Sequence, residues 1–426
     1  MNSGQRLKVL VSAYACSPLK GSEPAVGWGF VLAMAERHDL WVIVEEEKFR
    51  SDIEGWQRAN PEYADRIHFY FLHKRRNRWL RRLWPPSYYW YYRRWHRDAL
   101  ALARQLNEEV GFDLAHQLTM VGYREPGYLW RLDLPFVWGP VGGMGFFPWG
   151  FLGSVGARGA LYYVGYNTYN WLQARLLRRP KVAAQRAGSG LVFATNENRV
   201  AGERQWGCTG LVIPEVGLPP VSPNSINRRE SGEAMRIIWS GQHTPRKALN
   251  IGLLALAKLP PQASWELHVL GVGPQTSKWR KLAEQLDLSS HCHFHGQLTR
   301  EDALSLMESG HLMLITSLRD LTATVTIEAM AAGLPIVCPD HCGFSDAVTE
   351  DCGFKVSTDS PDAMVEGLAR SLGELCRDEA LRHKLARGAL VRAQQYGWGR
   401  KGELMDEVYR ARHNEHLEEL DGGRSL

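Results

Sequence analysis

Residues 317–338 read SLRDLTATVTIEAMAAGLPIVC, and this stretch decides the fold. The apolar residues HLMLITS just before it predict a buried strand, VTIEAMAAG predicts a helix and LPIVCP predicts the next strand. Asp320 lies in the loop after the first strand, and Glu328 lies one turn inside the helix that begins near Thr324. Ligands of open α/β sheets bind at the carboxyl ends of strands, where a helix N-terminus offers N–H groups to an anion. The stretch therefore predicts an α/β domain with an anion site at this edge.

The same alternation of strand and helix extends outward along the chain. MRIIWSGQ, WELHVLGVG and HCHFHGQL read as strands separated by helical segments, and near the N-terminus LKVLVSAYA and LWVIVEE flank the helical FVLAMAERH. A chain of 426 residues exceeds what one hydrophobic core usually serves. We therefore expect an α/β fold of two Rossmann-like domains over residues 1–215 and 216–396, joined at the proline-rich LVIPEVGLPPVSP. The C-terminal helix, residues 397–426, is expected to pack back on the first domain.

Two further blocks in the second half carry features suited to a diphosphate. WSGQHTPRKAL, residues 239–249, follows a predicted strand and contains the adjacent cations Arg246 and Lys247. A leaving diphosphate gains negative charge in the transition state, so positioned cations stabilise the transition state more than the substrate. LHVLGVGPQTS adds Gly271 and Gly273 in a tight turn after the next strand, a weak motif by itself.

In this order the blocks resemble the family 4 retaining glycosyltransferases of the GT-B fold. That family has two glutamates separated by seven residues and then an AMAxGxP run; here Glu328 and residues 329–335 match, and Asp320 replaces the first glutamate. The resemblance implies two Rossmann-like domains that face each other across a cleft. It also implies that a nucleotide-sugar donor binds to the second domain.

The resemblance assigns roles to residues of the second domain. Glu328 would hold the ribose hydroxyls of the donor, Asp320 the sugar hydroxyls, and the N–H groups of Thr324 and Val325 the phosphates. Lys247 matches the family lysine that neutralises the diphosphate, whereas Gln242 stands where the family has an arginine, and Arg246 is a candidate substitute for it. The loop at Gly296 and Gln297 would contact the base through its backbone.

In the first domain the resemblance is weaker. Gly21 and Ser22 occupy the loop where the family has a glycine pair beside the donor phosphate and acceptor, and His116 matches a histidine that reaches the donor sugar. A lone histidine is often a hydrogen-bonded structural residue, so both interpretations of His116 stay open. Arg124 and Glu125 follow in a loop that is a candidate acceptor contact.

Metal and cofactor sites are not expected. His291, His293 and His295 alternate along one predicted strand, and a second group, Cys338, His341, Cys342 and Cys352, lies close in sequence, but neither has the paired spacing of a zinc site. Seven scattered cysteines suit a reducing compartment. We expect no cofactor other than the nucleotide diphosphate sugar that serves as co-substrate.

Residues 74–97 carry nine Lys or Arg and no acid, interleaved with eight Trp or Tyr. We expect this segment to contact an anionic membrane, where cations are attracted and Trp and Tyr prefer the headgroup level. Packing beneath the first domain is one alternative. Nucleic acid is another, which the donor motifs disfavour, so no nucleic-acid partner is expected.

The sequence thus predicts a metal-independent hexosyltransferase, and the resemblance to family 4 implies that it retains anomeric configuration. It would move a sugar from a nucleotide diphosphate to a hydroxyl of a glycan, plausibly lipid-linked, in surface polysaccharide biosynthesis. The opening MNSGQRLKVLVSAYA shows no signal peptide, so we expect a cytoplasmic protein on the inner face of the membrane. The alternatives are a nucleotide-sugar epimerase of the same fold and a non-catalytic member of a glycan assembly complex.

Overall fold

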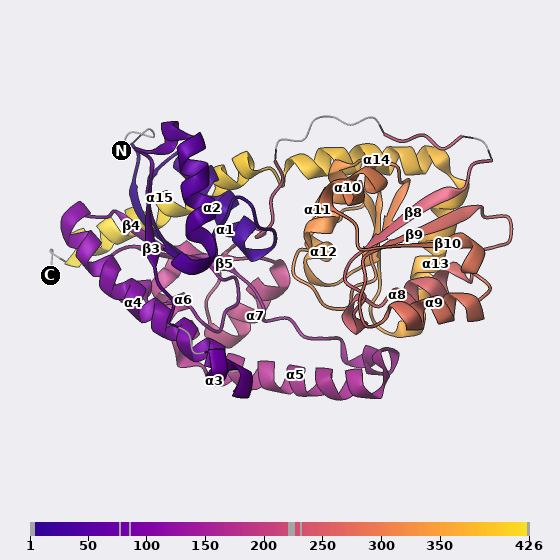
Figure 1. The fold of residues 1–426 in the computed structure, drawn as a ribbon, viewed down its shortest axis with the longest axis horizontal. Helices are drawn as coiled ribbons and strands as arrows, with labels where there is room; N and C mark the ends of the chain where they lie inside the picture. The colour runs from indigo at the N-terminus through magenta and orange to yellow at the C-terminus, as the bar shows by residue number, and fades with distance from the viewer. Residues whose placement is uncertain (1–4, 76–77, 85–86, 220–225, 231, 424–426) are drawn as a thin grey trace. The chain divides into compact units, whose positions relative to one another are not determined.

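The computed structural model describes residues 5–75, 78–84, 87–219, 226–230 and 232–423. The chain divides into two compact units (Figure 1). Unit 1 contains residues 1–144, 172–217 and 398–426, and unit 2 contains residues 145–171 and 218–397. Each unit is built around a parallel sheet, which confirms the predicted class of two Rossmann-like domains.

Unit 1 has a seven-stranded sheet in the order β3-β2-β1-β4-β5-β6-β7. In the first strand KVLVSA every residue after Lys8 is buried, as is typical of a central strand in a parallel sheet. The strands are β1 (Lys8–Ala13), β2 (Asp39–Glu45), β3 (Ile67–Leu72), β4 (Leu114–Thr119), β5 (Phe136–Val141), β6 (Leu191–Phe193) and β7 (Leu211–Val212).

The helices associated with unit 1 include a long C-terminal one. They are α1 (Glu23–Ala35), α2 (Glu46–Ala59), α3 (Arg78–Leu83), α4 (Ser87–Val110), α6 (Arg178–Ala187), α7 (Asn196–Trp206) and α15 (Trp398–Gly423). Helix α15 packs closely on α1, because a Cβ atom at Gly29 would lie 2.1 Å from the Trp398 ring. Any larger residue at position 29 would push the two helices apart.

Unit 2 has a six-stranded parallel sheet in the order β10-β9-β8-β11-β12-β13. Helices α8 and α9 cover one face, and α10 and α11 cover the other (Figure 1). The strands are β8 (Met235–Ser240), β9 (Trp265–Leu270), β10 (Cys292–Gly296), β11 (Leu312–Leu314), β12 (Ile336–Pro339) and β13 (Gly353–Val356). The helices are α8 (Leu249–Leu256), α9 (Thr276–Gln285), α10 (Arg300–Glu308), α11 (Thr324–Ala331), α12 (Cys342–Ala347), α13 (Pro361–Arg377) and α14 (Glu379–Gln394).

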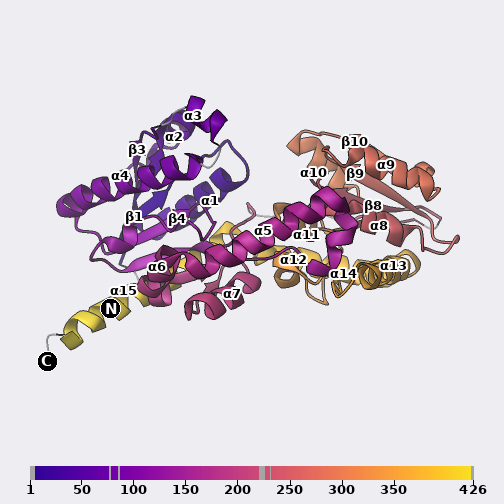
Figure 2. The ribbon, with the colours of Figure 1, turned by 90° about the horizontal axis from the view of Figure 1, so that it is seen from below.

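Residues 145–171 group with unit 2, although the sequence placed them within a first domain of residues 1–215. The Phe147 and Tyr163 rings stack with centroids 4.0 Å apart inside the hydrophobic core of unit 2. Asn167 holds this segment together, because its side chain accepts a hydrogen bond from the Phe147 N–H and donates one to the Phe147 carbonyl. Aromatic packing thus determines where this segment belongs, and it extends into α5 (Gly156–Leu176), seen along its length in Figure 2.

Helices that could cross a membrane were sought among the described residues. None is both long enough and apolar enough to do so.

Candidate active site

The candidate site lies at the carboxyl edge of the unit 2 sheet, where the ends of β8, β9 and β10 are bonded to one another. The N–H of Gly241 donates to the Leu270 carbonyl at 3.1 Å, and the N–H of Gly271 donates to the Gly296 carbonyl at 2.8 Å. Gly271 has φ +109°, and a Cβ atom there would lie 2.2 Å from the Gly241 carbonyl oxygen. Glycine is therefore required at this turn, and it brings three strand ends into direct contact.

Lys247, Arg246 and Asp320 form a charged cluster at this edge. Lys247 Nζ lies 2.6 Å from Asp320 Oδ2, and Arg246 Nη1 lies 3.2 Å from the same oxygen. Backbone geometry holds the two loops together, since the N–H of Leu318 donates to the Arg246 carbonyl at 2.8 Å. The structure thus brings together three residues that the sequence assigned to the donor site.

The charge state of Asp320 follows from this cluster. Burial raises the pKa of its carboxyl group, but the charges of Lys247 and Arg246 outweigh burial and hold that pKa below its ordinary value. The N–H of Leu321 adds a hydrogen bond to the carboxylate. Asp320 is therefore an anion at neutral pH. Together with the cations Lys247 and Arg246 it gives the cluster a net charge of one positive unit.

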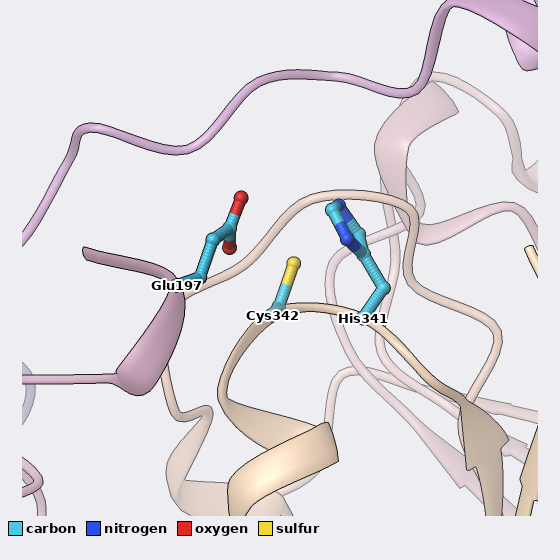
Figure 3. A group of neighbouring side chains, drawn as sticks. All are labelled: Glu197, His341 and Cys342. Carbon is cyan, nitrogen blue, oxygen red and sulfur yellow. The ribbon is translucent and has the colours of Figure 1, made fainter. Parts of the chain in front are cut away.

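The start of α12 lies next to the same loop. The N–H of Asp320 donates to Cys342 Sγ at 3.3 Å, and Figure 3 shows the Cys342 side chain beside that of His341. This contact fixes the backbone that carries the Asp320 carboxylate. Sequence reasoning had considered His341 and Cys342 only as metal ligands and did not foresee it.

Helix α11 begins immediately after this loop. Ala323 precedes it with φ 56°, and among the described residues no side chain caps the helix. The first N–H groups of a helix lack intrahelical partners, so those of Thr324 and Val325 have the character of an anion site. The predicted helix start is confirmed, and Thr324 is its first residue.

Glu328 already has a partner in this structure. Arg300, the first residue of α10, places Nη2 2.6 Å from Glu328 Oε1. The Arg300 side chain is 70% exposed and that of Glu328 is 14% exposed, so the arginine can move into solvent while the carboxylate stays in place. Sequence reasoning missed Arg300, because nothing in its local pattern indicates contact with α11.

Two glutamines lie at the rim of this edge. Gln242 and Gln297 are both exposed, and the Gln242 backbone carbonyl accepts a hydrogen bond from the N–H of Thr244. Arg246, in contrast, contacts Asp320 and also donates to the Arg319 carbonyl at 2.9 Å. Of the two positions considered for the family arginine, Arg246 is the one that joins the charged cluster.

His116 occupies a structural position in unit 1. Its Nδ1 lies 2.6 Å from the Tyr409 hydroxyl of α15, and its Nε2 lies 2.8 Å from the Gly139 carbonyl. Burial lowers the pKa of His116 to about 4, so the ring is neutral at pH 7. Both nitrogens are engaged, and in this conformation the ring ties α15 to the sheet instead of presenting a nitrogen to a substrate.

The remaining first-domain candidates lie in unit 1. Ser22 has φ 59° and precedes α1, while Gly21 has open space around the position of a Cβ atom. Glu125 is buried and accepts hydrogen bonds from Arg93 and Arg179, which gives it a structural role. Arg124 donates to the Gln173 side chain.

An anion site of two cations and a helix N-terminus at the carboxyl edge of a parallel sheet is typical of nucleotide-binding α/β proteins. Comparison with known proteins shows which nucleotide-binding α/β proteins this chain is similar to. Residues 224–390 match the family model "Glycosyl transferases group 1". This match agrees with the resemblance drawn from the sequence.

Individual relatives agree with this family. D-inositol 3-phosphate glycosyltransferase from Streptomyces avermitilis is 26% identical over 49% of this chain and 48% of the relative. Lipopolysaccharide glucosyltransferase WaaG from Escherichia coli is 28% identical over 34% of this chain and 40% of the relative. The chain thus spans about half the length, or less, of these curated relatives.

The fold is shared over almost the whole chain. The solved structure of HepE from Anabaena in complex with UDP matches 95% of this chain and 100% of its own, with TM-score 0.59 and 15% identity. Identity this low shows the fold alone, and that fold is the one found in GT-B glycosyltransferases. The predicted fold class is therefore confirmed.

Proposed function

We propose that this protein is a retaining glycosyltransferase that moves a sugar from a nucleotide diphosphate to a hydroxyl of a glycan. The observation that carries the proposal is the cluster in which Lys247 and Arg246 lie 2.6 and 3.2 Å from Asp320 at the carboxyl edge of the unit 2 sheet. The family match over the same unit and the UDP bound to HepE support a nucleotide-sugar donor.

The proposed reaction balances without a protein nucleophile. The bond between the anomeric carbon and the β-phosphate oxygen breaks, and the acceptor hydroxyl oxygen bonds to the same carbon. The acceptor proton passes to the leaving phosphate, which carries the electron pair of the broken bond. Retention of configuration through this front-face route comes from the family resemblance.

The residues around the leaving group suit this charge development. Lys247, Arg246 and the N–H groups at the start of α11 would oppose the charge that accumulates on the diphosphate. Asp320 holds both cations in place before the donor arrives, so little reorganisation is needed. We infer that these groups supply the positive charge and that the chemical step is metal-independent.

Glu328 is proposed to bind the donor ribose. Because Arg300 pairs with its carboxylate in this structure, donor hydroxyls would have to displace or share that arginine. The pair is worth little because Arg300 is mostly solvated, and exposed ion pairs typically contribute about 0–1 kcal/mol. Displacement of Arg300 would therefore cost the donor little binding energy.

We further propose that the acceptor is lipid-linked and that unit 1 contacts an anionic membrane. Within residues 74–97, four aromatic side chains are exposed and Trp79 is 71% exposed; the four are Trp79, Trp84, Tyr89 and Trp90. Residues 76–77 and 85–86 of this segment lie outside the described part of the chain. Exposed Trp and Tyr beside cations are typical of a surface at the headgroup level.

Part of the same segment packs inward. Lys74 is buried, with Nζ 2.9 Å from the Tyr14 hydroxyl and 4.0 Å from the centre of the Tyr88 ring. Trp95 donates its indole N–H to the Leu72 carbonyl at 2.9 Å. Arg93 pairs with Glu125 at 3.1 Å. Internal packing thus explains some of the basic and aromatic residues of this segment. The membrane proposal rests on the exposed aromatic side chains.

Helix α5 presents a second exposed apolar surface that the sequence did not identify. Leu161 and Leu176 are 76% and 71% exposed, and Tyr162, Tyr169, Trp171 and Leu172 are exposed as well. Leu161, Leu172 and Leu176 follow the spacing of one helical face. Residues 134–196 contain no acidic residue, so an anionic surface meets no repulsion along α5.

The membrane proposal is tested by co-sedimentation with vesicles of neutral or anionic lipid at low and high salt. We expect wild type to bind anionic vesicles in a salt-dependent manner and a variant with Trp79, Trp84 and Trp90 changed to Ser to bind at least tenfold more weakly. Val391→Ser is the matched control, because Val391 is 61% exposed on α14. Equal binding by all three proteins, or preference for single-stranded nucleic acid, would contradict the proposal.

The enzymatic proposal is tested with nucleoside diphosphates as probes of thermal stability and with sugar transfer or donor hydrolysis as readout. Binding raises the melting temperature by mass action. Stabilisation by one nucleoside diphosphate together with transfer supports the assignment. Stabilisation without any turnover would instead support a non-catalytic member of the family, and interconversion of donor epimers would support the epimerase alternative.

A further inference from the structure

A cluster of three histidines and one glutamate lies on β9 and β10, apart from the charged site at the strand ends. The two strands are parallel neighbours at the edge of the sheet (Figure 1). His293 lies in register with His268. Glu266 and His295 are each two residues away along their own strands. Since side chains alternate between the faces of a strand, all four project from the same face.

The nitrogen and oxygen atoms of this cluster converge. Glu266 Oε2 lies 3.6 Å from His268 Nε2 and 3.9 Å from His293 Nε2. The three ligand atoms all lie within 4.8 Å of one another. In a tetrahedral site with bonds of about 2.0–2.1 Å, ligand atoms are about 3.4 Å apart. Small side-chain rotations would therefore bring these atoms around one ion.

His295 completes the arrangement without being a ligand. Its Nε2 lies 3.0 Å from Nδ1 of His268, and the two rings are nearly parallel, 9° apart. With Nδ1 engaged in this hydrogen bond, His268 directs Nε2 toward Glu266 and His293. Metal-binding histidines are commonly oriented in this way through the nitrogen that does not bind the ion.

The neighbouring strand does not neutralise Glu266. Arg236 of β8 lies in register with Glu266, but its guanidinium group contacts Glu233, His311 and the Ser309 carbonyl. The partners of the Glu266 carboxylate among the described residues are the two histidines. A carboxylate facing two imidazoles is a suitable ligand set for a divalent ion.

We propose that Glu266, His268 and His293 bind a divalent transition-metal ion, with His295 as a positioning residue. Two imidazole nitrogens and one carboxylate oxygen favour Zn²⁺, Ni²⁺, Co²⁺ or Cu²⁺ over Mg²⁺ and Ca²⁺, which prefer oxygen ligands. The ion would join the edge strand β10 to β9 and leave at least one coordination position to water. The proposal is independent of the glycosyltransferase assignment.

The test is a titration of the full chain, free of any histidine tag, with Zn²⁺ by calorimetry and with Co²⁺ by visible absorption. We expect saturable binding of one ion per chain and a rise in melting temperature with Zn²⁺. His268→Ala and His293→Ala should each weaken binding at least tenfold. His295→Ala should keep the stoichiometry and weaken binding about tenfold, because it removes an orienting hydrogen bond.

His73→Ala is the matched control, since His73 is exposed and lies 3.8 and 3.7 Å from Glu46 and Glu47 in a one-histidine arrangement. It should bind Zn²⁺ as wild type does. Melting without metal shows whether each variant is folded. Absence of saturable binding by wild type would overturn the proposal, and so would wild-type affinity in a folded His268→Ala variant.

Discussion

The charged cluster at the strand ends predicts an asymmetry between two substitutions that each remove one charge. In Lys247→Ala, Asp320 keeps Arg246 at 3.2 Å, so the carboxylate is still paired. In Asp320→Asn, both Lys247 and Arg246 lose the anion that they share. We expect the lysine variant to lose mainly turnover and the aspartate variant to lose more stability.

The magnitudes follow from burial. The Lys247 and Asp320 side chains are 11% and 18% exposed, so their contact is largely shielded from solvent. Leaving buried charges without a partner costs about 3–5 kcal/mol. Because these side chains are partly exposed, we expect Asp320→Asn to lose about 3 kcal/mol of stability. Losing one charged hydrogen bond while another remains costs about 1–2 kcal/mol for Lys247→Ala. A cation at the leaving diphosphate is worth about 3 kcal/mol, or about a hundredfold in turnover.

The assay combines urea unfolding with steady-state sugar transfer for both variants. Lys247→Ala should lose at least tenfold in turnover with a modest fall in the urea midpoint, whereas Asp320→Asn should show a larger fall. Lys258→Ala is a control for loss of a lysine, because Lys258 forms an exposed pair with Glu366. Turnover of Lys247→Ala within twofold of wild type would refute the donor-site role, and equal stability of the two variants would refute the shared-anion argument.

Further predictions concern the site and its surroundings. Glu328→Ala should lower turnover at least tenfold in the transfer assay while leaving the fold intact, because a donor contact is lost. Excess chelator should leave transfer unchanged; complete loss that Mg²⁺ or Mn²⁺ restores would contradict the metal-independent mechanism. The pKa of Asp320 is lowered, so the stability that its carboxylate contributes is present above the unfolded value of about 3.9 and is lost as pH falls through the folded value. Urea unfolding of Asp320→Asn should therefore show a smaller loss of stability in that pH range. The pKa of His116 is lowered to about 4, so stability should fall as pH falls from about 6.5 to about 4, by about 3 kcal/mol, and His116→Gln should lack that component.

The fold of unit 2 could be predicted because its signals are local. Several strands there carry short apolar runs, such as those at Met235–Ser240 and Ile336–Pro339, and segments with helical spacing separate them. Such alternation allows few topologies besides a parallel sheet. The position of Asp320 just after a strand follows from the same reasoning.

The assignment of residues 145–171 could not be predicted, because it depends on long-range aromatic packing. The segment has Arg158 as its one charged residue and is rich in glycine near its start, and nothing local distinguishes one domain from the other. Phe147 and Phe151 enter the core of unit 2, and Arg319 lies 3.8 Å from the centre of the Tyr166 ring. Arg319 and Tyr166 are 153 residues apart in sequence.

The candidate site divides in the same way. Lys247 and Asp320 are 73 residues apart, yet both follow predicted strands of one parallel sheet, whose carboxyl ends share an edge. Their contact could therefore be expected. The Arg300–Glu328 pair could not, because it depends on how α10 lies against α11. His116 was ambiguous because the partner of its Nδ1, Tyr409, belongs to the C-terminal helix.

The basic aromatic segment shows why composition cannot separate a binding surface from a core. Lys74 is a cation in an aromatic run, as a membrane contact would be, yet it is 2% exposed and lies among the rings of Tyr14, Tyr88 and Tyr92. Such rings attract a cation by their quadrupole, and the Tyr14 hydroxyl gives Nζ a hydrogen-bond partner. Trp79, a few residues away in the same composition, is 71% exposed. Since residues 74–97 include both buried and exposed aromatic and basic side chains, the same composition serves packing and a surface at once. The vesicle test must therefore target Trp79, Trp84 and Trp90 and leave Lys74 unchanged.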